Sequence, residues 1–296
     1  MAITASLVKE LRERTGAGMM ECKKALTATD GDIDAAIENM RKSGQAKAAK
    51  KAGRIAADGV IVQATSADNK TGVLVEVNCE TDFVAKDEHF TSFANAVAQR
   101  ALETGVSEVA ELMALPLHAG EDATLDETRE ALIVKIGENM QVRRIQHITA
   151  SGTLSGYQHG VRIGVLVDLS GGEDSLGKDL AMHIAATSPI CLTEDQVPAE
   201  VLEKEQAVVS AQAAESGKPA NIIEKMVVGR MRKYLAEITL LGQAFVKDPD
   251  LTITGLLNKQ QAKIHAFTRF EVGEGIEKKS ENFRDEVMAQ AAAARG

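Results

Sequence analysis

Gly72-Val-Leu-Val-Glu-Val77 recurs later in the chain as Gly164-Val-Leu-Val-Asp-Leu169, with the acidic residue at the same place. Each segment is rich in β-branched residues and follows another short apolar run and a polar turn, which predicts a β-hairpin. We expect the first hairpin to pair residues 59–65 with 71–78, and the second to pair residues 149–155 with 161–169.

The same order of patterns follows both hairpins. Apolar residues at helical spacing surround Phe93 and Leu132 in the first half, and surround Leu180 and Leu256 in the second. A further strand then closes each half, at residues 140–148 and 264–272. The order strand, strand, helix, helix, strand occurs twice, so the sequence predicts a duplicated core of the α+β class.

Helical segments flank and interrupt this core. Three short helices are expected in the first 40-odd residues, followed by a basic stretch that we interpret as a solvated helical linker, with a nucleic-acid arm as the alternative. In the second half, Ser216-Gly-Lys-Pro219 separates two helical stretches, which predicts an inserted antiparallel helical hairpin. A C-terminal helix carries Phe283 and Val287 on one stripe, and packs on its own body or docks on a partner. The expected divisions are a three-helix module with its linker (1–54), a first core subdomain (55–148), a second core subdomain (149–193 and 238–273), the hairpin (194–237) and a C-terminal module (274–296).

Whole-chain properties narrow the class of function. The net charge of −9 argues against broad nucleic-acid binding, because phosphate contacts need clustered Lys and Arg. The three cysteines are far apart and lack CxxC spacing, which indicates a reducing compartment without a disulfide or zinc framework. The N-terminus lacks the apolar region of a signal peptide, and no run reaches the roughly 18–20 apolar residues that span a bilayer. We therefore expect a cytoplasmic protein that contacts neither membrane nor nucleic acid.

Enzyme motifs are weak. Gly172-Glu-Asp-Ser-Leu-Gly-Lys-Asp179 resembles a phosphate-binding loop, but Asp179 replaces the Ser or Thr that would bind magnesium. Glu173 and Asp174 add negative charge, so a polar turn is the better interpretation and a nucleotide hydrolase the alternative. Asp30, Asp32 and Asp34 imitate a calcium loop, yet helix capping explains them. We expect no catalytic residues, no metal and no cofactor.

The turn after residues 71–78 allows two interpretations. In the first, Thr81 or Asp82 caps the next helix and Phe83 packs in the core, and the residues alone favour it. In the second, the turn presents an acid and an aromatic side chain outward as an insertion wedge.

Three motifs resemble those of the bacterial elongation factor Ts family. They are Thr81-Asp-Phe-Val84 after a Val-rich strand, Leu7-Val-Lys-Glu-Leu-Arg-Glu-Arg-Thr-Gly-Ala-Gly-Met-Met20, and Arg269-Phe-Glu-Val-Gly-Glu-Gly275. The similarity runs from residue 3 to about residue 288. It implies an N-terminal module like a ubiquitin-associated domain, two related core subdomains, a coiled-coil hairpin and a C-terminal helical module.

The resemblance also implies guanine-nucleotide exchange on elongation factor Tu, in a heterodimer or a higher assembly. Thr81, Asp82, Phe83 and Val84 would enter the GTPase near its magnesium and phosphate site. The other expected contacts are with the nucleotide-binding domain, through Arg12, Met19, Met20, Phe283 and Val287, and with another domain, through Gln158, His159 and Gly160. Glu80 departs from the family, in which Gln is commoner at this place. A ubiquitin-like adaptor built on residues 1–45 is a further alternative, but it does not account for the duplicated core.

Overall fold

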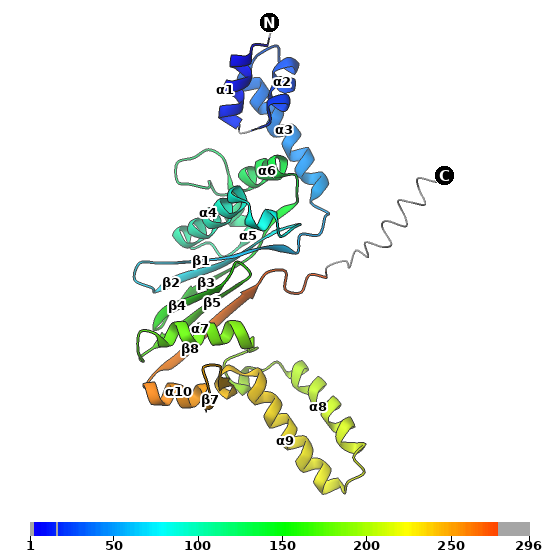
Figure 1. Ribbon diagram of the computed structural model, residues 1–296, viewed down its shortest axis with the longest axis vertical. Helices are drawn as coiled ribbons and strands as arrows, with labels where there is room; N and C mark the ends of the chain where they lie inside the picture. Colours follow the sequence, from blue (N-terminus) through cyan, green and yellow to red (C-terminus); the bar gives the residue numbers. More distant parts are fainter. Residues whose placement is uncertain (1–2, 16, 278–296) are drawn as a thin grey trace, which may run out of the picture.

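The computed structural model describes residues 3–15 and 17–277, and its helices and sheets form a mixed α+β structure (Figure 1). Phe283, Val287 and the expected C-terminal helix lie outside the described residues. Within the described ranges, no helix combines the length and the apolar character needed to cross a bilayer.

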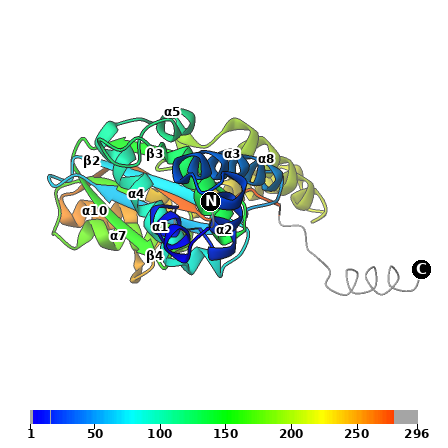
Figure 2. The same cartoon turned by 90° about the horizontal axis from the view of Figure 1, so that it is seen from above.

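Three helices form the N-terminal end. α1 (Ala5–Thr15), α2 (Met19–Ala28) and α3 (Ile33–Lys51) enclose a small core that includes Leu11 and Leu26. Asp32 caps α3 by accepting a hydrogen bond from the Ala35 N–H at 3.0 Å, as expected from its sequence. α3 continues through most of the basic stretch and ends at Lys51. Seen from above, α1, α2 and α3 lie over the core, and α8 extends to one side (Figure 2).

Two three-stranded antiparallel sheets form the centre, in the orders β1-β2-β3 and β4-β5-β8. The repeated segments lie in the middle strands, β2 and β5, and the two sheets have corresponding strand orders. The strands are β1 (Asp58–Thr65), β2 (Thr71–Cys79), β3 (Met140–Thr149), β4 (Thr153–His159), β5 (Ile163–Ser170) and β8 (Lys263–Glu271).

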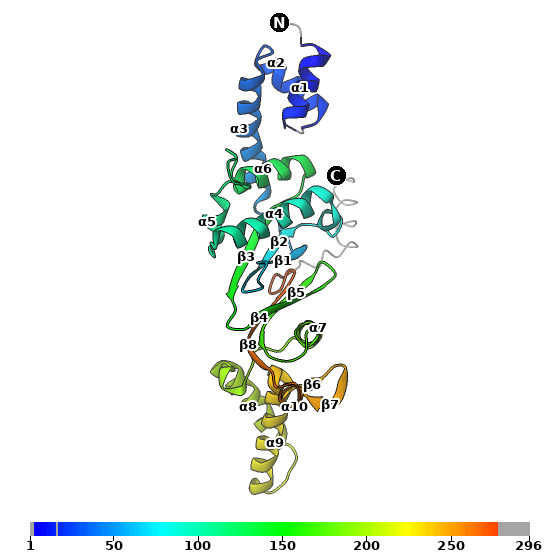
Figure 3. The ribbon, with the colours of Figure 1, turned by 90° about the vertical axis from the view of Figure 1, so that its left-hand side faces the viewer.

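Helices cover the outer faces of both sheets, so the core has four layers, with the two sheets in the middle (Figures 1 and 3). The first sheet is covered by α4 (Glu88–Thr104), α5 (Val109–Met113) and α6 (Leu125–Ile136). The second is covered by α7 (Leu176–Thr187) and α10 (Ile253–Gln260), with the small strands β6 (Ala244–Phe245) and β7 (Asp248–Thr252) beside them. Between α7 and β6 the chain forms α8 (Ala199–Ala214) and α9 (Ala220–Ile238), which pack on each other on either side of the expected break.

The structure corrects several expected boundaries. The strand expected at residues 149–155 begins only at Thr153, because the N–H groups of Ser151 and Gly152 both donate to the Asp168 carboxylate, at 2.8 Å each. Tyr157, Gln158 and His159, which fall between the two strands expected for the second hairpin, belong to β4. The short helix α5 and the strands β6 and β7 were not expected.

The glycines of the repeated segments allow the two sheets to pack closely. A Cβ added at Gly164 would lie 2.6 Å from Ile61 Cγ2 and 3.1 Å from Leu74 Cδ2 on the opposite sheet. A Cβ added at Gly72 would lie 2.7 Å from Leu154 Cδ1. Since the buried side chains between the sheets are close-packed, the glycine of each repeat is needed for the approach of the other half.

Gly164→Ala is therefore expected to destabilise the fold by about 1–3 kcal/mol, because the added methyl group overpacks the space between the sheets. The control is Gly229→Ala in α9, where nothing lies within 4 Å of the added Cβ. This control should stabilise by about 0.5–1 kcal/mol, because Ala is the better helix former. Urea unfolding of both variants measures the difference, and equal stabilities would contradict close packing at Gly164.

Candidate functional site

The turn between β2 and α4 lies where the first sheet ends. After Cys79 the chain passes through a short 3₁₀ helix, Val84–Lys86, before α4 begins at Glu88. Asp87 caps α4, because its carboxylate accepts hydrogen bonds from the N–H groups of His89 (2.9 Å) and Phe90 (3.2 Å). The expectation that Thr81 or Asp82 caps this helix is therefore wrong.

Phe83 projects from this turn into solvent. Its side chain is 81% exposed, whereas its neighbours Val84 and Ala85 are 8% and 4% exposed and belong to the first core. The interpretation that Phe83 packs in the core, which the residues alone favoured, is wrong. The turn is thus anchored by small apolar residues and presents one large aromatic ring outward.

Hydrogen bonds in both directions join two neighbouring residues at the base of the turn, Glu80 and Thr81, to Glu138 and Asn139. Glu138 Oε2 accepts from the N–H groups of Glu80 (3.1 Å) and Thr81 (3.0 Å), and Glu138 Oε1 accepts from the Thr81 hydroxyl at 2.7 Å. In return, Glu80 Oε1 accepts from the Asn139 N–H at 2.6 Å. The turn is therefore tied to the segment that enters β3.

Charged groups also surround Phe83. Asp82 Oδ2 lies 2.8 Å from Lys86 Nζ in an exposed pair one helical turn apart.

Burial and the nearby charges of Glu138 and Asp58 raise the pKa of the Cys79 thiol to about 12. At neutral pH this thiol is protonated, so it does not act as a nucleophile beside the turn.

The other expected contact residues lie on separate elements. Arg12 is exposed on α1, and Met19 and Met20 are 63% and 78% exposed at the start of α2. Met20 also lines a hollow of about 750 Å³ whose other lining side chains include Lys23 and Lys47.

At the far end of β4, Gln158 donates to the Ile61 carbonyl at 2.6 Å, and the His159 ring lies 3.1 Å from the Tyr157 hydroxyl. Gly160, with a φ of 56°, begins the turn that follows. Gln158, His159 and Gly160 are all exposed, so they remain accessible to a partner.

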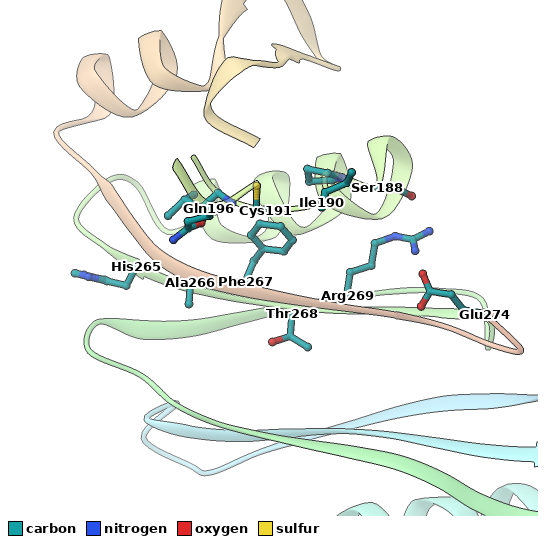
Figure 4. Close-up of a pocket in the computed structure, with 12 residues that line it drawn as sticks. Ser188, Ile190, Cys191, Gln196, His265, Ala266, Phe267, Thr268, Arg269 and Glu274 are labelled. Carbon is teal, nitrogen blue, oxygen red and sulfur yellow. Dashed lines mark hydrogen bonds between the residues drawn. The ribbon is translucent and has the colours of Figure 1, made fainter. Parts of the chain in front are cut away.

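A cavity of about 520 Å³ lies between β8 and residues 188–192 (Figure 4). Phe267 and Arg269 of β8 project toward that segment, with Glu274 beside the arginine (Figure 4). Among the described residues, no group of three or more His, Cys, Asp or Glu side chains is placed to hold a metal ion.

The segment that resembles a phosphate-binding loop forms a closed turn. The Leu176 N–H donates to the Glu173 carbonyl, and a Cβ at Gly172 would lie 2.4 Å from Leu176 Cδ2. Asp179 pairs with Lys247 at 2.6 Å. One N–H group of the segment is therefore already hydrogen-bonded within it, the Leu176 side chain crowds Gly172, and the acidic side chains Glu173, Asp174 and Asp179 oppose a phosphate.

We expect that the purified chain does not bind GTP with micromolar or tighter affinity, because this turn is closed and acidic. Equilibrium dialysis with labelled GTP measures the affinity. As a control, Asp179→Ser restores the missing hydroxyl, and it too should bind no nucleotide if the closed turn is the reason. Micromolar binding by the unmodified chain would contradict the interpretation.

Sequence reasoning missed Glu138. It lies 58 residues from Glu80 in the chain and precedes β3 in no recognisable motif, so no local signal relates it to the turn.

Known proteins resemble this chain over almost its whole length. A family model described as Elongation factor TS matches residues 80–274. Proteins named Elongation factor Ts are 63% identical in Thioalkalivibrio sulfidiphilus (98% of this chain, 99% of the relative) and 58% identical in Methylococcus capsulatus (99% and 100%). A third, from Alkalilimnicola ehrlichii, is 59% identical (98% and 99%). The family model covers the turn that carries Phe83, β3 and the whole second sheet, the relatives align over nearly the whole chain, and the chain belongs to the elongation factor Ts family of translation elongation factors.

Proposed function

We propose that the chain binds elongation factor Tu in its GDP form and promotes release of GDP, so that GTP can bind in its place. The turn formed by Thr81, Asp82, Phe83 and Val84 would disturb the magnesium and phosphate site of the GTPase through its exposed side chains, while Val84 anchors it in the first core. The observation that carries the proposal is the 81% exposure of Phe83 beside two buried neighbours. A large aromatic side chain left in water on an anchored turn is suited to burial against a partner.

The proposed mechanism needs no acid, base or nucleophile from this chain. A GTPase holds its diphosphate through backbone N–H groups, a lysine and a magnesium ion. Insertion of the turn would displace the metal or the phosphate loop and remove several charge-assisted contacts together. Because coupling between two binding sites is reciprocal, the chain and GDP weaken each other's binding by the same factor.

Further contacts would orient the chain on its partner. Arg12, Met19 and Met20 would contact the nucleotide-binding domain, and their exposure supports this role. Gln158, His159 and Gly160 would contact another domain. Phe283 and Val287, which lie outside the described residues, would contact the nucleotide-binding domain again. The complex would be a heterodimer or a higher assembly.

Release of a fluorescent GDP analogue from purified elongation factor Tu tests the proposal. A substoichiometric amount of the chain should accelerate release, because one molecule acts on many copies of the GTPase in turn. Added magnesium should slow the accelerated reaction, because it favours the metal-bound state that the turn displaces. Unchanged release with the chain in excess would overturn the proposal.

A further inference from the structure

Beyond the last paired residues of the first sheet, carboxylates replace the ladder of backbone hydrogen bonds. Cys79 and Met140 are the last pair of β2 and β3, and the two strands separate after them. The N–H groups of Glu80, Thr81 and Asn139 then find acceptors in the side chains of Glu138 and Glu80. These side chains close the end of the sheet at the residues that begin the turn.

Glu138 accepts two of these hydrogen bonds and a third from a hydroxyl group. Its two oxygens accept from two consecutive backbone N–H groups and from the Thr81 hydroxyl, within 3.1 Å. The Thr81 Oγ1 in turn lies 3.4 Å from the Val84 N–H, and the Thr81 carbonyl accepts from the Ala85 N–H at 3.2 Å. The contacts run from Glu138 to Thr81, which precedes Phe83, and from Thr81 to Val84 and Ala85, which follow Phe83. Hydrogen bonds to a carboxylate are stronger than neutral ones and fix direction as well as distance.

The residues on either side of Glu138 are hydrogen-bonded to the end of α3 and the segment that follows it. Asn139 Nδ2 donates to the Arg54 carbonyl at 2.8 Å, and Lys51 Nζ at the end of α3 donates to the Gly137 carbonyl. Glu138 therefore belongs to a segment that is fixed in place by hydrogen bonds to the linker after the N-terminal helices.

We propose that Glu138 is a positioning residue for nucleotide exchange, which holds residues 80–81 so that Phe83 is oriented before the partner binds. The inference rests on the proposed function and assigns a role to a residue that does not itself enter the partner. A wedge that is already ordered loses less conformational entropy on insertion, and more of its burial free energy is available to displace the nucleotide.

The experiment compares GDP release for Glu138→Ala, Glu138→Gln and Thr124→Ala. Glu138→Ala is expected to slow release about tenfold, since the charge-assisted contacts that orient the turn are lost. Glu138→Gln should restore most of the rate, because its amide oxygen can accept from both N–H groups and its amide nitrogen can donate to Thr81 Oγ1. Thr124→Ala removes the capping hydrogen bond of α6 in the same half, away from the turn, and should leave the rate near that of the unmodified chain.

A double-mutant cycle with Phe83→Ala separates positioning from general stability. If Glu138 acts through Phe83, Glu138→Ala should slow release little further once Phe83 is absent. Hydrogen exchange at the Glu80 and Thr81 amides of the partner-free chain should be faster in Glu138→Ala and near normal in Glu138→Gln.

Each alternative outcome identifies which statement fails. An unaffected rate in Glu138→Ala, or the same further slowing in the Phe83→Ala background, would overturn the inference and leave the proposed function intact. If the unmodified chain does not accelerate GDP release, the proposed function fails and the role of Glu138 fails with it.

Discussion

Phe83→Ala is expected to slow GDP release about ten- to a hundredfold, because burying a Phe side chain contributes roughly 1.5–3 kcal/mol that the variant can no longer supply. The stability of the isolated chain should hardly change, since the ring is 81% exposed and makes little contact with its own core. Thermal unfolding and release of a fluorescent GDP analogue measure the two effects on the same sample.

Phe90→Ala is the matched control for Phe83→Ala. Phe90 lies in the next helix and is fully buried, so the same truncation should destabilise the fold by about 3–5 kcal/mol. The same substitution is thus made at a Phe side chain proposed to be buried only against the partner and at one buried in the chain's own core. Normal GDP release in Phe83→Ala, together with a sharp loss of stability, would show that the ring contributes to folding and not to exchange.

The α+β class and the order of strands and helices could be predicted because the evidence for them is local. The repeated segments, the polar turn at residues 67–70 and the spacing of the apolar residues each depend on near neighbours in the chain. The orientation of Phe83 could not be obtained in this way. Phe, Val and Ala in succession fit a buried turn as well as an exposed one. The choice is made by the anchoring of Val84 and by the hydrogen bonds that the Glu80 and Thr81 N–H groups donate to Glu138, which is 58 residues from Glu80 in the chain.

The displaced start of β4 shows the same limit. Residues 149–155 have the composition of a strand, but Ser151 and Gly152 turn to donate to Asp168 in β5. Glu76 in β2 accepts in the same way from the Gly273 N–H, at 2.7 Å, just after β8. The acidic residue of each repeat therefore binds the backbone that follows the last strand of the other half. The sequence shows that the acidic residues recur, but not that they join the two halves.

Of the two acidic residues, Glu76 makes more contacts than Asp168. Besides Gly273, its buried carboxylate pairs with Arg143 Nη1 (3.1 Å) and Arg144 Nε (2.5 Å). Arg144 also donates to the Glu271 carbonyl and stacks over the Phe270 ring at 4.1 Å. One carboxylate therefore organises contacts from β3 and from the end of the second half.

Glu76→Ala is expected to destabilise the fold by about 3–5 kcal/mol, because it leaves two guanidinium groups and a backbone N–H without their buried partner. Glu76→Gln keeps the shape and part of the hydrogen bonding, so its loss should be smaller. Glu103→Ala is the control, because the Glu103 carboxylate is exposed and Arg100, its partner at 3.5 Å, also donates to the Pro116 carbonyl, so the loss should stay below about 1 kcal/mol. Urea unfolding at neutral pH gives the three values, and equal losses for Glu76→Ala and Glu103→Ala would contradict the prediction.

The pH dependence of folding stability tests whether the charge of Glu76 is the cause of its stabilising effect. Burial by itself would raise the pKa of Glu76, but hydrogen bonds from Gly273 and Asn78 and the charge of Arg144 outweigh it and hold the pKa below its ordinary value. Because the folded-state pKa is lowered, the stabilisation is fully present above the unfolded-state pKa of about 4.3 and is lost as the pH falls through the folded-state pKa. The difference in stability between the unmodified chain and Glu76→Gln should therefore be constant near neutral pH and should narrow on acidification below about pH 4.3. A difference that stays constant across this range would mean that Glu76 stabilises the joint between the sheets through its shape and not through its charge.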